Sequence, residues 1–269
     1  MGTSQSSEGP SSGVPLVPPW VEDPPGDGGL TDADTQMPEA PEAPALAPTA
    51  RFGGSRRALG DFAESGDRHR LRQGLSRYTR RGLGGSRTAA SRMAGTARAA
   101  SALYSILGGE SRDAAAPSQL DRSVLAGRSA QDVIKAILDA IRPVDGSDDA
   151  EATRNSANDA LTELIDQFGD ADLLDLTEQQ RIFVLERFVS MDVFRRFMLD
   201  LGKHILDRAP SSQAGAARIS EARDYIRETV IASFRRKTAN GTSIARSQVV
   251  ALMRRTLLDA FDVFAEYAE

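Results

Sequence analysis

The sequence predicts an all-α fold, with a helical bundle in the C-terminal half behind a long disordered Gly/Ser/Pro-rich N-terminal tail. Apolar residues recur at spacings of three and four through much of the second half, which is the pattern of amphipathic helices. Proline and glycine concentrate in the first 110 or so residues, where little packing is expected. No alternating run of useful length predicts a β-strand, and no repeat recurs at a fixed period.

Composition divides the chain into four regions. Residues 1–20 form a leader, 21–50 an acidic Pro-rich disordered linker, 51–112 an Arg/Gly/Ala-rich, partly helical segment, and 113–269 an α-helical domain. Spaced prolines favour extended polyproline II, so the linker is expected to act as a semi-rigid spacer. The segment 51–112 has mostly small apolar side chains that bury little area, so it is expected to be less stable than the domain behind it.

In the Arg/Gly/Ala-rich segment, short helices are expected at 55–64 and 67–81. The glycines of Gly82-Leu83-Gly84-Gly85 predict a break after them. Ser86 is then expected to cap a longer helix over 87–107.

The C-terminal domain is expected to contain helix after helix. Ser129 can cap a helix over 130–142, and a polar stretch separates it from a helix over 150–168. Thr177 and Gln180 have the spacing of a capping box and open a long pattern through 206, with a bend expected near 190–192. The last two helices are expected at 216–237 and after Asn240-Gly241, with Thr242 or Ser243 starting the final one.

The residue inventory excludes several classes of site. The chain has no Cys, which excludes disulfides, thiolate zinc sites and cysteine nucleophiles. His69 and His204 lie far apart without ligand-spaced neighbours, so no metal site and no cofactor are expected. No nucleophile, base and orienting group form a recognisable motif, so an enzyme is not expected. No apolar run could span a membrane and no signal peptide opens the chain, so a cytoplasmic location is expected.

The net charge of −5 conceals three blocks of alternating sign. Residues 1–50 hold eight acidic residues and no Lys or Arg, whereas residues 51–112 hold 13 Arg and four acidic residues. The remaining chain is acidic again. Such blocks often mark interaction segments, and the acidic block can also fold back over the basic one.

The basic block contains a candidate interaction patch, made of Arg68, Arg70, Arg72, Arg77, Arg80 and Arg81. Only Tyr78 interrupts it as a stacking group, so acidic partners or the acidic linker are favoured over nucleic acid. The glycines at 82–85 precede a helix start and could offer N–H groups to a phosphate. They lack the ending of a nucleotide-binding loop, which favours a hinge.

The leader carries the most informative chemistry. Removal of Met1 would expose the amine of Gly2 on an uncharged segment, and an α-amine with a pKa of about 7.7 to 8.0 is partly nucleophilic near neutral pH. Leu16, Val17 and Trp20 stand among prolines that favour an extended backbone, which suits docking in a partner's groove. Two alternatives remain, a passive tail and N-myristoylation, although the acidic residues that follow do not supply a second membrane anchor.

Several of these features together resemble the QatB family of bacterial Qat anti-phage defence systems. They are Met1-Gly2-Thr3-Ser4, a Gly/Ser stretch through Gly13, the block Pro15-Leu16-Val17-Pro18-Pro19-Trp20, and an Arg/Gly segment opening at Arg51-Phe52 ahead of a helical half. The resemblance implies a bacterial cytoplasmic protein that is encoded with an ATPase, a QueC-like enzyme and a TatD-like nuclease.

The resemblance further implies that this protein is a non-enzymatic component of the system. The QueC-like enzyme would activate a deazaguanine carboxylate with ATP and pass it to the amine of Gly2, while Thr3, Ser4 and residues 15–20 bind the partner. The alternative is a helical adaptor that scaffolds the ATPase and nuclease, with the tail as a tether only.

Overall fold

The computed structural model describes residues 15–17, 46–108, 125, 127–141, 147–169, 171–238 and 244–267. Within these ranges the regular elements are helices, and the one β-type feature is a single antiparallel bridge between Pro15 and Leu46. The all-α prediction is therefore confirmed. None of the described helices is both long enough and apolar enough to cross a membrane.

The helices follow one another closely along the described chain. In order they are α1 (Gly53–Ser65), α2 (Arg68–Arg77), the π-turn η1 (Tyr78–Gly82), α3 (Ser86–Arg92), α4 (Ala94–Leu107), α6 (Ala130–Ile141), α7 (Asp148–Gln167), α8 (Glu178–Phe197), the π-turn η2 (Met198–Gly202), α9 (Lys203–Arg208), α10 (Ser212–Thr238), the 3₁₀ turn η3 (Arg246–Gln248) and α11 (Val249–Glu266).

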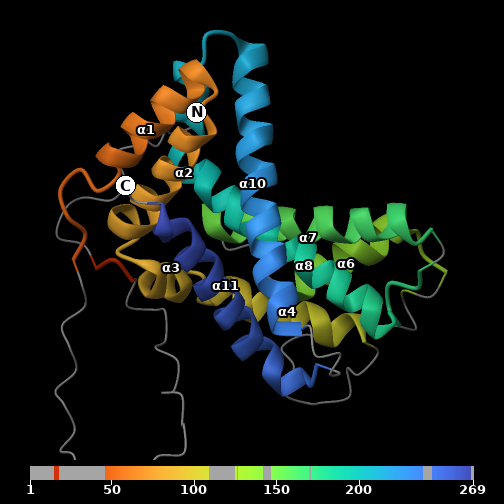
Figure 1. The fold of residues 1–269 in the computed structure, drawn as a ribbon. Helices are drawn as coiled ribbons and strands as arrows, with labels where there is room; N and C mark the ends of the chain where they lie inside the picture. Colours follow the sequence, from red (N-terminus) through yellow and green to blue (C-terminus); the bar gives the residue numbers. More distant parts are fainter. Residues whose placement is uncertain are drawn as a thin grey trace, which may run out of the picture.

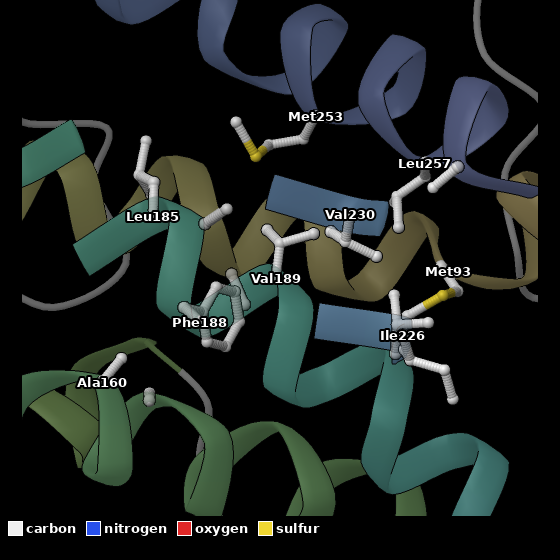
Figure 2. Packing of buried hydrophobic residues seen from close by; sticks show 14 of the residues in the cluster. Met93, Ala160, Leu185, Phe188, Val189, Ile226, Val230, Met253 and Leu257 are labelled. Carbon is white, nitrogen blue, oxygen red and sulfur yellow. The ribbon is translucent and has the colours of Figure 1, made fainter. Parts of the chain in front are cut away.

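Helices α8 and α10 lie at the centre of the bundle (Figure 1). Helices α1 and α2 pack together at one side, α6 and α7 at the other, and α11 crosses α10. Figure 2 shows the core that results, with Val189 of α8 beside Val230 of α10 and Met253 of α11 above them. All three side chains are fully buried.

The Arg/Gly/Ala-rich segment shares this core with the C-terminal helices. Leu59, Phe62 and Leu103 are fully buried and belong to the same cluster of apolar contacts as Phe188. Ala97 and Ala100 are buried on α4, which packs against α8 and α11. Their small side chains allow these helices to approach one another closely. One continuous core therefore holds residues on both sides of position 112.

Three helix boundaries differ from the sequence prediction. Helix α10 begins at Ser212, four residues before the predicted start at 216. Ser86 is the first residue of α3 and does not cap it, because Gly85, with a φ of 94°, occupies the N-cap position. The helix expected over 87–107 is split at Met93, whose side chain is buried at the junction of α3 and α4. The split redirects the chain so that α3 packs on α11 while α4 also reaches α8.

The long helical pattern through 206 changes direction in a different place than expected. The chain stays α-helical over 190–192, and the irregularity is the π-turn η2, from which α9 continues. A π-turn shifts the helical register by about one residue. Phe197, Leu201 and Ile205 are all buried across it.

Several start signals act as the sequence predicts. The Ser129 hydroxyl accepts a hydrogen bond from the Asp132 N–H at the start of α6, at 3.2 Å. Thr177 and Gln180 form the complete capping box of α8. The predicted turn at Asn240-Gly241 and the start at Thr242 or Ser243 lie outside the described residues.

Candidate functional site

Part of the leader is bound to the helical bundle of the same chain. The Leu16 side chain is 4% exposed. It lies against Gly84, where an added Cβ would stand 2.5 Å from Leu16 Cδ1. Arg92 of α3 donates a hydrogen bond from Nη1 to the Leu16 carbonyl oxygen, at 2.5 Å. We call Leu16, Gly84 and Arg92 the leader anchor.

The turn between η1 and α3 forms the receiving side of this anchor. Gly84 has a φ of 82°, a conformation that glycine adopts without strain. The Gly85 N–H donates to the Thr79 carbonyl oxygen at 2.9 Å, which closes the turn. A Cβ at Gly82 would stand 2.7 Å from the ring of Phe52, so this glycine admits an aromatic side chain. The glycine run thus forms a packed turn that holds the leader.

Residues 46–50, which lead into α1, begin next to the leader. Leu46 pairs with Pro15, and the next residue, Ala47, is buried. The Arg51 guanidinium stacks over the Phe52 ring, with its carbon 4.6 Å from the ring centroid. Burial, and secondarily the charge of Arg92, lower the pKa of Arg51. A buried cation therefore lies where the chain enters α1.

A cavity of about 140 Å³ adjoins the anchor, and Arg92 contributes to both. Its walls are lined by Tyr78, Leu83, Ala89, Arg92, Met93, Asp149, Val193, Arg196, Leu199, Asp200 and Phe261. The Tyr78 hydroxyl donates to Asp200 Oδ2 at 2.7 Å. Burial raises the pKa of the Asp200 carboxyl and raises that of Tyr78 well above its ordinary value. Tyr78 therefore remains a neutral donor at physiological pH.

An ionic network that runs from a buried carboxylate to the surface supports the far wall of this cavity. Arg196 pairs with Asp149 at 2.7 Å and with Asp192 at 3.3 Å. Asp192 is fully buried and accepts a hydrogen bond from the Thr96 hydroxyl at 2.5 Å. Burial alone would lower the pKa of Arg196, but the two carboxylates raise it above its ordinary value. The network joins α4, α7 and α8.

The predicted basic patch is divided by the fold. Arg68 pairs with Glu221 at 2.5 Å, and Arg70 lies 3.9 Å from Asp61. Arg72 stacks over the rings of Tyr225 and Tyr267, and Arg77 donates to the Gly54 carbonyl oxygen at 3.3 Å. Arg80 and Arg81 are exposed.

The two histidines serve separate local roles. His69 is exposed at the start of α2, where its backbone N–H donates a hydrogen bond to Asp67 Oδ1. His204 Nε2 lies 2.8 Å from the Arg56 carbonyl oxygen, and burial lowers its pKa. Within the described residues, no three His, Asp or Glu side chains are grouped so that they could hold a metal ion.

Most of the predicted leader contacts cannot be placed. Gly2, Thr3, Ser4, Pro18, Pro19 and Trp20 lie outside the described residues. Pro15 and Val17 are half-buried, and Leu16 is buried against its own chain. The contacts of Arg92 and Gly84 with the leader were not predicted from the sequence. The one signal in the sequence for this contact was the glycine pair Gly84-Gly85 before a helix start. Both glycines have a positive φ, a conformation that glycine adopts readily.

Comparison with known proteins identifies the family. The model of the family described as "Qat anti-phage system associated protein QatB" matches residues 84–264, more than half of the 269 residues. The match begins at Gly84 and includes Arg92, Asp192 and Arg196. No curated protein and no solved structure gave a significant match. The chain therefore belongs to the QatB family and is a component of the Qat anti-phage system.

Proposed function

We propose that this protein is the substrate of a QueC-like enzyme of the same defence system, which attaches a deazaguanine-type group to Gly2. In this proposal the chain is not itself a catalyst. The amine of Gly2 attacks a carboxylate that the enzyme has activated with ATP, an amide bond forms, the activating group leaves, and the amine loses a proton. Membership of the QatB family supports the proposal that the reaction takes place within the Qat anti-phage system.

The leader anchor is the observation that carries the proposal. Leu16 is held by its own chain, and thirteen residue steps separate Pro15 from Gly2. A fully extended chain of that length spans about 45 Å, so the amine cannot lie farther than this from the anchor. An enzyme bound to the helical bundle would therefore meet Gly2 at a raised effective concentration.

The anchor also divides the work within the leader. Leu16 has its side chain buried in the bundle and cannot enter a partner's groove unless it is released. The enzyme's active site would bind Gly2, Thr3 and Ser4. Beside the anchor, the enzyme would contact Pro15, Val17, Pro18, Pro19 and Trp20. Trp20 is the strongest candidate for an energetic hot spot, because Trp is enriched at such positions.

The test is the intact mass of the protein, with mapping of its N-terminal peptide, after production with and without the neighbouring genes. A mass addition at Gly2 that requires the active QueC-like enzyme is the expected result. A Gly2→Ala variant is the matched control, because it keeps a primary amine and tests whether glycine itself is read. A bare Gly2 in both samples would show that the proposal is wrong.

The second candidate function is a helical adaptor for the ATPase and the TatD-like nuclease. A groove of about 450 Å³ between α7, α8 and α10 favours this reading, because Phe194 and Met191 lie beside charged side chains of both signs there. Deleting residues 2–7 separates the two candidates. The adaptor keeps its defence function without them, whereas the modification substrate loses it even if the complex still assembles.

A further inference from the structure

Three arginines of the basic block lie on the two short elements beside the leader anchor. Arg80 and Arg81 lie on η1 and Arg87 lies on α3, and all three are exposed. Within the described part of the chain none of their guanidinium groups has an ion pair, a hydrogen bond or a ring contact. We call these three residues the basic rim.

Several earlier arginines of the same block are already engaged. Arg68 and Arg72 contact α10, through Glu221 and Tyr225 respectively, and Arg77 donates to the backbone of α1. Such contacts use these side chains to join helices. The rim arginines join no helices within the described residues, and an exposed guanidinium carries five donors that suit carboxylates.

The position of the rim is set by the anchor. Arg80 and Arg81 precede Gly84 by four and three residues, and Arg87 follows it by three. Gly84 contacts Leu16, so the rim arginines belong to the two short elements that hold the leader. An enzyme that reaches for the anchored leader has to approach these elements.

We propose that the basic rim is a docking surface for an acidic surface of the enzyme that modifies Gly2. This inference rests on the proposed function. Complementary charge steers encounter and orients the partners, and it raises the association rate at low salt. The rim positions the leader for the enzyme and takes no part in the chemistry at Gly2.

The structure favours an acidic protein over nucleic acid at this surface. Tyr78 is the one aromatic residue between Arg68 and Arg92, and its ring is 5% exposed. Its hydroxyl is engaged by Asp200, so it cannot serve as a stacking platform for a base. Without stacking, three cations would hold a nucleic acid only weakly at physiological salt.

The experiment compares two substrates with the purified QueC-like enzyme. One is the full chain and the other is a peptide of residues 2–20, which carries the leader without the rim. The variant is the triple charge reversal R80E/R81E/R87E in the full chain. Arg236→Glu is the matched control, because Arg236 is an exposed arginine near the end of α10, away from the leader anchor in the sequence. Circular dichroism and thermal unfolding establish that both variants fold.

We expect kcat/KM for the full chain to fall at least tenfold in the triple variant at low salt, with kcat little changed. The control should retain the wild-type kcat/KM, and the peptide should react as slowly as the triple variant. Added salt should narrow the difference in kcat/KM between the wild-type chain and the triple variant.

Three results would overturn the inference. Wild-type rates in the triple variant would refute the rim while leaving the proposed function intact. A faster triple variant would indicate that the rim holds the chain's own acidic linker. Absence of any modification in the wild-type chain would refute the proposed function, and the rim inference with it.

Discussion

Truncation of Leu16 tests the leader anchor most directly. Leu16→Ala removes three buried carbons, and at about 0.8 kcal/mol per buried methylene this amounts to about 2 kcal/mol. The leader can relax, so the cost should stay near this transfer value without a large cavity contribution. Because 1.4 kcal/mol is a factor of ten, the anchored state should lose about 30-fold in its equilibrium against the released state.

Gly84→Ala tests the same contact from the other side. Its new Cβ would stand 2.5 Å from Leu16 Cδ1, and the φ of 82° is strained for alanine. In the double variant the shorter residue 16 makes room for the new Cβ. The combined loss should therefore be smaller than the sum of the two single losses.

Amide hydrogen exchange, read by mass spectrometry on peptides that contain residues 15–17 and 46–50, is the assay. Both single variants should exchange faster there while the core of α8 and α10 keeps its protection. Wild-type exchange of residues 15–17 at the unprotected rate would refute the anchor, as would strictly additive effects in the double variant.

Three further predictions concern the fold. Asp192→Ala should lower the free energy of unfolding by about 2 to 3 kcal/mol in urea titrations, because it removes one of the two carboxylates that pair with Arg196 and leaves the Thr96 hydroxyl unpaired; a loss below about 1 kcal/mol would contradict the ionic network. Thr177→Ala should cost about 1 kcal/mol through loss of the α8 capping box, measured in the same titrations, and Thr177→Ser should restore most of it. Burial lowers the pKa of His204 from its ordinary value of 6.5, so the folded state favours the neutral ring. The contribution of this ring to the free energy of unfolding is fully present above pH 6.5 and is lost as the pH falls below it, because the unfolded chain binds the proton more readily. His204→Gln should flatten thermal unfolding temperatures between about pH 7 and 5, and an unchanged slope would show that another group is responsible.

The helical pattern was legible in the sequence because amphipathic spacing and caps are local signals. Thr177 with Gln180, and Ser129 with the residues after it, start their helices as predicted. The break at Met93 was not legible, because small residues on both sides carry too little periodicity to mark it. The π-turn at Met198–Gly202 was missed for a related reason, since only the packing of Phe197, Leu201 and Ile205 against other helices requires it.

The candidate site divides in the same way. The composition of residues 2–20 predicted a segment that binds a partner, and the glycines at 82–85 predicted a break between helices. Their meeting at Leu16 and Gly84 joins residues nearly seventy positions apart, which no local pattern encodes. The basic patch was likewise a matter of composition. Which of its arginines contact other described helices, as Arg68 and Arg72 do, depends on the helices that lie opposite them.

The sequence by itself determined the all-α class, most helix starts and the charge blocks, because these depend on residue type and short-range spacing. Only the tertiary structure decided that residues 51–108 share one core with the C-terminal helices, and that Leu16 belongs to that bundle. These features depend on contacts between distant segments, where shape and buried charge select the partner, and such selection leaves no period in the sequence.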